Sequence, residues 1–154
     1  MNRLFYLALI YLFASPAWAD PPEGYPFQSF DQATQQATSE NKPIFVYFGR
    51  FGCGYCDKTN KEAFSSPMVR EVYTKNYALA YVEAESGKRL RLPNGERVTE
   101  REMGTRYNAF ATPVFTFLTP KGDTLLQIIG IQSIDTLLKA SEQVQEKIKA
   151  SKTP

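Results

Sequence analysis

The two cysteines of this 154-residue chain, Cys53 and Cys56, are separated by Gly54 and Tyr55. Two thiols at this spacing can form a structural disulfide, supply half of a metal site, or exchange a disulfide with another molecule. A structural disulfide here would stabilise the fold little, because the entropy removed from the unfolded chain grows with loop length. A zinc site needs four ligands, and the chain has no further cysteine and no histidine. Disulfide exchange is therefore favoured, and we expect no metal and no cofactor.

The residues around the first cysteine predict a strand, a tight turn and a helix. Residues 44–48 (IFVYF) are aromatic or β-branched, which is typical of a buried strand. Residues 49–52 (GRFG) form the turn, and residues 53–64 are expected to be helical. Unpaired N–H groups in the first turn would favour the thiolate of Cys53, which is the attacking species. Cys56, one turn further along and deeper, is suited to attack a mixed disulfide between Cys53 and a substrate.

The residues between the cysteines bear on the direction of electron flow. Gly54 and Tyr55 place no charge between the sulfurs, and the chain has no imidazole that could stabilise a thiolate. The motif therefore lacks the extreme thiolate stabilisation of a strongly oxidising pair. This favours a reductase, although the reduction potential also depends on neighbours outside the motif.

A second feature of interest is the dipeptide Thr112-Pro113 at the start of a predicted strand. Proline at a strand start has a simple structural explanation, because its missing N–H does no harm there. The functional alternative is a cis bond, which would expose the backbone of Thr112 for pairing with an extended substrate. The residue pattern leaves both interpretations open.

The remaining patterns predict one α/β domain. The expected helices cover about 30–40 after Ser29, 67 to about 75 after Ser66, a short stretch after Thr99 to about 107, and a long segment after Ser133, and the expected strands cover 78–84, 113–118 and 124–129, with a small hairpin within 86–98. Met68 and Ile134 are among the apolar residues expected to face the core. This order implies a central mixed sheet of about four strands with helices on both faces.

The first nineteen residues have the layout of a secretory signal peptide. A ten-residue apolar run at 4–13 is followed by Ala17-Trp18-Ala19, a cleavage pattern, directly before Asp20. The run is too short to cross a bilayer comfortably, so an uncleaved anchor is the less favoured alternative. We expect export, with a signal peptide at 1–19 and a single domain at 20–154.

The charge of the chain excludes one class of partner. A net charge of +2 argues against nucleic acid, which needs a concentrated basic surface. The local exception is KRLR at 88–91. A solvated loop is the favoured interpretation of these cations, and docking of an acidic partner is the alternative.

Taken together, these motifs resemble the thioredoxin fold over about residues 29–149. More narrowly, KPIFVYFGRFGCGYC, the inserted LPNGERVTEREMGTRYN and ATPVFTFL resemble the periplasmic thioredoxin-like proteins of the SoxW type. The resemblance implies a three-layer fold and a periplasmic location. It also implies a nucleophile at Cys53, a resolving cysteine at Cys56 and a cis-proline at Pro113, with Gly54, Tyr55 and Thr112 among the substrate-binding positions.

The chain departs from cytosolic thioredoxins at several of their motif positions. It has Gly52 where they carry tryptophan, and Gly-Tyr where they carry Gly-Pro between the cysteines. Tyr47 occupies the position of a buried aspartate that is thought to assist proton transfer from the resolving cysteine. Glu83 or Glu85 could substitute, but ordinary strand-end charges are the favoured interpretation.

These observations predict a monomeric, periplasmic thiol:disulfide oxidoreductase that acts mainly as a reductase of client-protein disulfides. An inner-membrane electron donor would have to keep it reduced, because the periplasm is oxidising. Gly-Tyr with threonine before the proline also resembles the catalytic domain of periplasmic disulfide isomerases, which carry a separate dimerisation domain for which this chain has no room. An isomerase and a redox-inert thioredoxin-fold binding protein are the alternatives.

Overall fold

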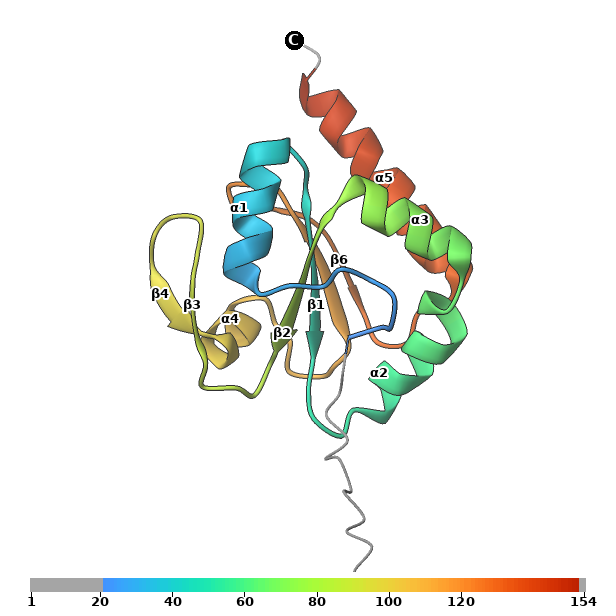
Figure 1. Ribbon diagram of the computed structural model, residues 1–154, viewed down its shortest axis with the longest axis horizontal. Helices are drawn as coiled ribbons and strands as arrows, with labels where there is room; N and C mark the ends of the chain where they lie inside the picture. Colours follow the sequence, from blue (N-terminus) through green and yellow to red (C-terminus); the bar gives the residue numbers. More distant parts are fainter. Residues whose placement is uncertain (1–20, 153–154) are drawn as a thin grey trace, which may run out of the picture.

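A four-stranded mixed sheet forms the centre of the molecule (Figure 1). The computed structural model describes residues 21–152, so the predicted signal peptide lies outside the described residues. The strand order is β2-β1-β5-β6, with β1 parallel to β2 and the other pairs antiparallel. The strands are β1 (Ile44–Gly49), β2 (Ala78–Glu83), β5 (Val114–Leu118) and β6 (Thr124–Ile129).

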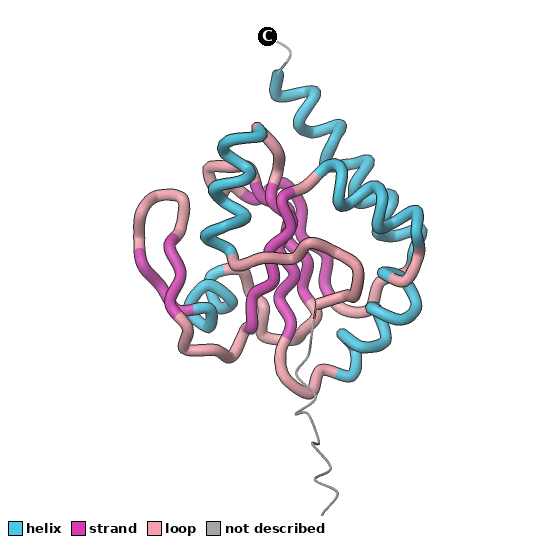
Figure 2. The backbone as a smooth tube through the Cα atoms, in the orientation of Figure 1, coloured by secondary structure: helices cyan, strands magenta, loops and turns pink. Residues whose placement is uncertain are grey.

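Helices cover both faces of this sheet (Figure 2). One face carries α1 (Phe30–Glu40) and α4 (Glu100–Arg106), and the other carries α2 (Gly54–Thr59), α3 (Pro67–Asn76) and α5 (Ile134–Lys152). The predicted three-layer α/β fold is therefore confirmed. None of the helices within residues 21–152 is long and apolar enough to span a bilayer.

The molecule has one hydrophobic core on each face of the sheet, and strand β1, whose residues are all buried, contributes side chains to both. Its side chains alternate between the faces, so Val46 and Phe48 enter one core while Phe45 and Tyr47 enter the other. The second core is rich in aromatic rings. The rings whose centroids lie within 6.3 Å of the Phe45 ring belong to Phe27, Phe64, Tyr73, Tyr77, Phe115 and Phe117.

Caps confirm the helix starts predicted at Ser29 and Thr99. Ser29 and Gln32 form a capping box at α1, and Thr99 and Glu102 form one at α4. Helix α3 begins at proline, as predicted, but the side chain of Ser66 makes no capping hydrogen bond. The missing N–H of proline leaves one fewer donor to satisfy there.

The helix predicted at 53–64 is present but changes its type, and two residues predicted to face the core are exposed. The expected helix at 53–64 divides into α2 and a π-helical turn, η1 (Asn60–Phe64), where Asn60 bonds to the hydroxyl of Tyr47. Met68 and Ile134 are 60% and 39% exposed. Met68 lies at the rim of a groove between α3 and α5, and Ile134 occupies the exposed first turn of α5, so neither reaches the core.

The segment between β2 and α4 forms the predicted hairpin. Strands β3 (Arg89–Arg91) and β4 (Arg97–Thr99) pair antiparallel as a separate two-stranded sheet. Gly95 adopts φ +88° in the connecting turn, a conformation that favours glycine. The hairpin projects at the side of the molecule beside α1 (Figure 1).

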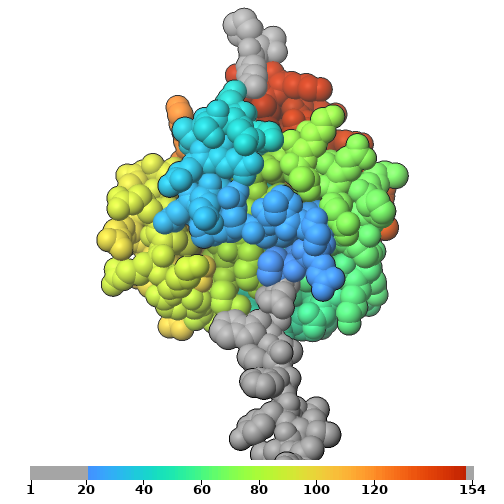
Figure 3. All heavy atoms as spheres, viewed as in Figure 1, coloured from blue at the N-terminus to red at the C-terminus, as the bar shows by residue number. Residues whose placement is uncertain are grey.

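Residues 21–28 lie across the outer surface next to α1, as the darker blue atoms of Figure 3 show. Gln28 ties this segment to the edge of the sheet through two backbone hydrogen bonds. Its N–H donates to Leu79 O at 3.0 Å, and its carbonyl accepts the N–H of Tyr81 at 3.1 Å. The segment therefore extends the pairing at the free edge of β2.

Buried tyrosines predict a loss of stability at alkaline pH. Burial raises the pKa of Tyr25 to about 12 and the pKa values of Tyr47, Tyr73 and Tyr77 above 10 as well. The unfolded chain releases these protons from about pH 10 upward, whereas the folded chain keeps them. For each of the three fully buried tyrosines the free energy of unfolding should fall by at most about 1.4 kcal/mol per pH unit above 10.

Urea unfolding followed by circular dichroism at about pH 8 and about pH 11 measures this effect. The buried tyrosines do not lower the free energy of unfolding below about pH 10. The urea midpoint should therefore be lower at about pH 11 than at about pH 8 for this reason. Tyr73→Phe removes one of the titrating hydroxyls, which donates to Leu137 O at 2.8 Å, and should reduce the pH dependence while lowering stability at both values. Equal midpoints at the two pH values would contradict the prediction.

Candidate functional site

Cys53 and Cys56 form a disulfide at the start of α2. Their sulfurs are 2.09 Å apart and their Cα atoms 5.2 Å apart. Cys53 is the N-cap residue of α2, and its Sγ accepts the backbone N–H of Cys56 at 3.1 Å. Gly52 enters the turn before it with φ +70°, which favours glycine. The strand, turn and helix predicted from the sequence therefore place the sulfur of Cys53 where helix N–H groups point.

The two cysteines differ in access from solvent. Cys53 is 4% exposed and Cys56 1% exposed, whereas Gly54 and Tyr55 between them are exposed. Both cysteines pack with the aromatic core on this face of the sheet, and Cys53 is slightly the more accessible of the two. The roles of nucleophile at Cys53 and resolving cysteine at Cys56 stay predictions.

The loop before β5 completes the site from a distant part of the chain. The hydroxyl of Thr112 donates to the Sγ of Cys53 at 3.2 Å, across a separation of 59 residues. The Thr112–Pro113 peptide bond is cis. The N–H of Gly130, after β6, donates to Pro113 O at 2.8 Å and ties this loop to the sheet. The structure thus brings the two predicted motifs, the cysteine pair and Thr112-Pro113, into contact.

Beneath the disulfide lies a polar contact that the sequence reasoning missed. The hydroxyl of Tyr47 donates to Asn60 Oδ1 at 3.0 Å and lies 3.5 Å from the carbonyl oxygen of Cys56. Burial raises the pKa of Tyr47 well above 10, and the charges of Tyr81 and Asp57 add to this. Tyr47 therefore stays neutral and acts as a hydrogen-bond donor under the helix turn that carries Cys56.

A family model described as "Thioredoxin-like domain" matches residues 30–145, which include the cysteine pair and the Thr112-Pro113 loop. The chain belongs to the thioredoxin-like family. A search of curated protein sequences found no match.

Solved structures agree with this assignment. A thioredoxin from Thermus thermophilus is 25% identical, with 80% of this chain and 88% of that chain covered and a TM-score of 0.65. A putative disulphide-isomerase from Bacteroides thetaiotaomicron is 22% identical, with 82% and 98% covered and a TM-score of 0.63. The C-terminal domain of DsbD from Neisseria meningitidis, in the oxidised form, is 17% identical, with 73% and 90% covered and a TM-score of 0.57. The last two likenesses concern the fold alone.

In this thioredoxin-like protein Glu83 lies beside the turn that precedes Cys53. Burial at the end of β2 raises its pKa, although the N–H groups of Glu85 and Phe51 donate to its carboxylate and oppose the shift. Phe51 belongs to the turn before Cys53. The carboxylate of Glu83 is thus tied to the N–H of Phe51 in this turn and to the N–H of Glu85 after β2. Glu85 is exposed and pairs with Arg50 at 3.3 Å.

Exposed apolar side chains lie around the disulfide. Phe51 and Tyr55 flank Cys53 in the chain, and Phe110 lies in the loop before Thr112; they are 60%, 65% and 70% exposed. Ile129 and Ile131, at 58% and 42%, flank Gly130, which is bonded to Pro113. Exposed apolar side chains that gather in one region are typical of surfaces that contact other molecules. Sequence reasoning singled out Tyr55 but missed the others, since a single exposed apolar residue has no distinguishing pattern.

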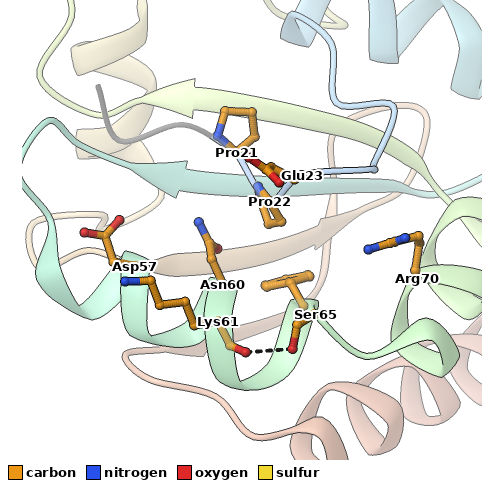
Figure 4. A pocket seen from close by; sticks show the side chains of 9 residues that line it. Pro21, Pro22, Glu23, Asp57, Asn60, Lys61, Ser65 and Arg70 are labelled. Atoms are coloured by element: carbon orange, nitrogen blue, oxygen red, sulfur yellow. Dashed lines mark hydrogen bonds between the residues drawn. The ribbon is translucent and has the colours of Figure 1, made fainter. Parts of the chain in front are cut away.

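A cleft of about 490 Å³ with a mixed polar and apolar lining lies along α2 and η1 (Figure 4). Asp57, Asn60 and Lys61 line it from the helix, and Arg70 lies opposite, with its guanidinium 5.5 Å from the Tyr25 ring centroid. Neither cysteine lines the cleft, so it is distinct from the disulfide. Among residues 21–152 there is no cluster of three or more histidine, cysteine, aspartate or glutamate side chains that could hold a metal ion.

Replacing Thr112 with valine is expected to lower the thiolate fraction of reduced Cys53. Valine keeps the shape of threonine but removes the hydroxyl that donates to the sulfur. The loss of one hydrogen bond corresponds to a roughly two- to tenfold change in the thiol–thiolate equilibrium. Thiolate absorbance near 240 nm at neutral pH, recorded in a Cys56→Ser background so that one thiol reports, measures the change. Thr112→Ser keeps the hydroxyl and should resemble the parent, and a valine variant that also does so would contradict the prediction.

Proposed function

We propose that this protein is an exported thiol:disulfide oxidoreductase of the SoxW type, which reduces disulfides of client proteins in the periplasm. The observation that carries the proposal is the disulfide of Cys53 and Cys56 at a helix N-terminus, with the hydroxyl of Thr112 donating to the sulfur of Cys53. The N–H groups at the helix N-terminus and the hydroxyl of Thr112 both favour a thiolate at Cys53 once the pair is reduced.

The reaction begins with the reduced pair. The Cys53 thiolate attacks one sulfur of a client disulfide, the client S–S bond breaks, and the second client sulfur leaves as a thiolate that takes up a proton. Cys56 then loses its proton and attacks the sulfur of Cys53. The mixed disulfide breaks, the first client sulfur leaves as a thiolate and is protonated, and Cys53–Cys56 is oxidised. Two electrons pass from the protein to the client.

Two features support reduction as the main direction. No charged side chain lies between the sulfurs, and the chain contains no histidine. Neutral Tyr47 lies under the helix turn of Cys56, so the described contacts beneath the pair add no positive charge that would hold a thiolate strongly. In the oxidising periplasm, an inner-membrane electron donor would return electrons to the disulfide. The protein would act on its clients as a monomer.

The exported location rests on residues 1–19, with their apolar run and the Ala17-Trp18-Ala19 pattern. Fractionation of cells that produce the full chain, with N-terminal sequencing of the product, tests it. Recovery from the periplasmic fraction with Asp20 as the first residue is expected. Recovery of the uncleaved chain from the membrane fraction would contradict a cleaved signal.

Insulin reduction with dithiothreitol as electron donor tests the activity. The protein should accelerate precipitation of the insulin B chain well above the rate with dithiothreitol alone. Refolding of scrambled ribonuclease tests the isomerase alternative, which the combination of Gly54-Tyr55 with Thr112 favours. Efficient refolding with poor insulin reduction would replace reductase by isomerase, and inactivity in both assays would favour a redox-inert binding protein.

A further inference from the structure

The inserted hairpin carries an arginine-rich face that disulfide exchange does not use. Leu90 and Val98 are 6% and 3% exposed and pack into the core beside α1 and α4. Since side chains alternate along a strand, Arg89, Arg91 and Arg97 share the opposite, solvent-facing side, and all three are exposed. We call these three side chains the arginine face.

Two members of the arginine face are placed against each other. Arg91 and Arg97 are directly opposite in the register of β3 and β4. Like charges at directly opposite positions of an antiparallel pair destabilise the pair. Among residues 21–152, none of the arginine face forms an ion pair, and Arg91 donates from its guanidinium to the carbonyl oxygen of Gly95 at 3.4 Å. The arrangement therefore does not serve the stability of the hairpin.

Nearby carboxylates already have other partners. Asp31 on α1 accepts the backbone N–H of Arg91 at 2.7 Å. Glu96, in the hairpin turn, accepts two hydrogen bonds from the guanidinium of Arg106 on α4. These contacts fix the hairpin to its two neighbouring helices. They leave the guanidinium groups of Arg91 and Arg97 available to a partner.

Glu102 is a further carboxylate close to the arginine face. Its hydrogen bonds from the N–H and the hydroxyl of Thr99 lower its pKa, and the charge of Arg89 adds to that effect. Glu102 thus offsets part of the charge of Arg89 while capping α4. Residues 86–106 nevertheless contain six lysines and arginines against three glutamates, a larger excess than the net charge of +2 of the whole chain. The positive excess of the protein is concentrated in this segment.

We propose that the arginine face binds an acidic segment of a partner protein. Planar guanidinium groups bind carboxylates with two parallel hydrogen bonds, and three of them on a short ribbon match a run of aspartate and glutamate. No large apolar side chain of residues 86–106 is exposed, whereas interfacial helices bind a membrane surface through buried apolar area as well as through charge. Charge complementarity and the absence of apolar anchors therefore favour a protein segment over a lipid surface.

The arginine face lies apart from the disulfide. Leu90 and Val98 belong to the core on one face of the sheet, and the two cysteines belong to the core on the other. In Figure 1 the hairpin lies at the left edge, whereas α2 lies at the lower right. A partner held by the arginine face would leave the sulfurs accessible. The proposed surface thus acts as a docking site in addition to the redox site.

Fluorescence anisotropy with a labelled peptide of alternating aspartate and glutamate tests the proposal. The full protein should bind the peptide saturably at low ionic strength and lose affinity as sodium chloride is added. Replacing Arg89, Arg91 and Arg97 together by glutamine should weaken binding at least about tenfold. The matched control replaces three exposed lysines elsewhere by glutamine, namely Lys75, Lys121 and Lys139, and should leave affinity within about twofold.

Several outcomes would overturn the proposal. Absence of saturable binding, equal weakening in both triple variants, or binding to phosphatidylglycerol vesicles without binding to the peptide would each do so. The Cys53→Ser protein should bind the peptide with unchanged affinity, because the surface is independent of the redox pair. The proposed docking site and the proposed disulfide exchange can therefore be refuted independently of each other.

Discussion

Replacing Cys53 with serine is expected to lower insulin reduction to the rate given by dithiothreitol alone, so that the part of the rate that depends on the protein falls by at least about a hundredfold. The serine hydroxyl is not ionised at neutral pH and forms no mixed disulfide, so the first step of the exchange is lost. The sulfur of Cys53 is also the one that accepts hydrogen bonds from Thr112 and from the N–H of Cys56. The other cysteine, Cys56, is 1% exposed and is therefore poorly placed to attack a client in its stead.

A control must show that the loss of activity is not caused by unfolding of the variant. Since the disulfide closes a short loop, its removal should lower the free energy of unfolding only modestly. Circular dichroism and urea unfolding of Cys53→Ser, compared with the parent protein, establish that the variant is folded. Retention of the parental rate of insulin reduction by a folded Cys53→Ser protein would contradict the assigned chemistry.

Replacing Cys56 with serine is expected to trap client proteins on Cys53. The first attack still occurs, but no thiolate is available to release the client, so the mixed disulfide accumulates. In the parent protein, Cys56 is 1% exposed and its Cα is 5.2 Å from that of Cys53, which suits attack from within the protein rather than capture of a client. Trapped complexes should appear on non-reducing gels and disappear when a reductant is added.

The matched control for trapping is the double variant Cys53→Ser/Cys56→Ser, which should capture nothing. Cys53→Ser alone tests the order of attack, because the buried Cys56 should trap few clients. If Cys53→Ser trapped as many proteins as Cys56→Ser, the roles of nucleophile and resolving cysteine would have to be exchanged. Mass spectrometry of the trapped proteins would identify the clients.

Much of the fold could be predicted because its signals are local. Residues 44–48 contain no charged side chain, and the two capping boxes mark helix starts within four residues. The prediction failed where a distant partner decides the conformation. The expected helix at 53–64 changes to a π-helical turn at Asn60, whose partner Tyr47 lies on another element. Helical periodicity likewise could not tell that α5 leaves Met68 uncovered.

The candidate site was predictable in its residue types but not in its contacts. The spacing of Cys53 and Cys56 identified the pair, and the absence of histidine removed the main competing chemistries. The hydrogen bond from Thr112 to Cys53 joins residues 59 positions apart, so no local pattern reports it. Of the arginine face, the basic run at 88–91 indicated only Arg89 and Arg91. The register of the hairpin adds Arg97 and directs Arg89, Arg91 and Arg97 to one side.

The reduction potential of the Cys53–Cys56 pair tests the central claim most directly. The protein is equilibrated with reduced and oxidised glutathione, or with dithiothreitol where glutathione is too weak, and the fraction of free thiols is measured by mass spectrometry after alkylation. We predict a reversible two-electron couple, clearly more negative than the potential of about −120 mV that characterises strong protein oxidants. A potential near that value would contradict the assignment as a reductase, and a disulfide that does not exchange with either thiol would contradict the assignment as an oxidoreductase.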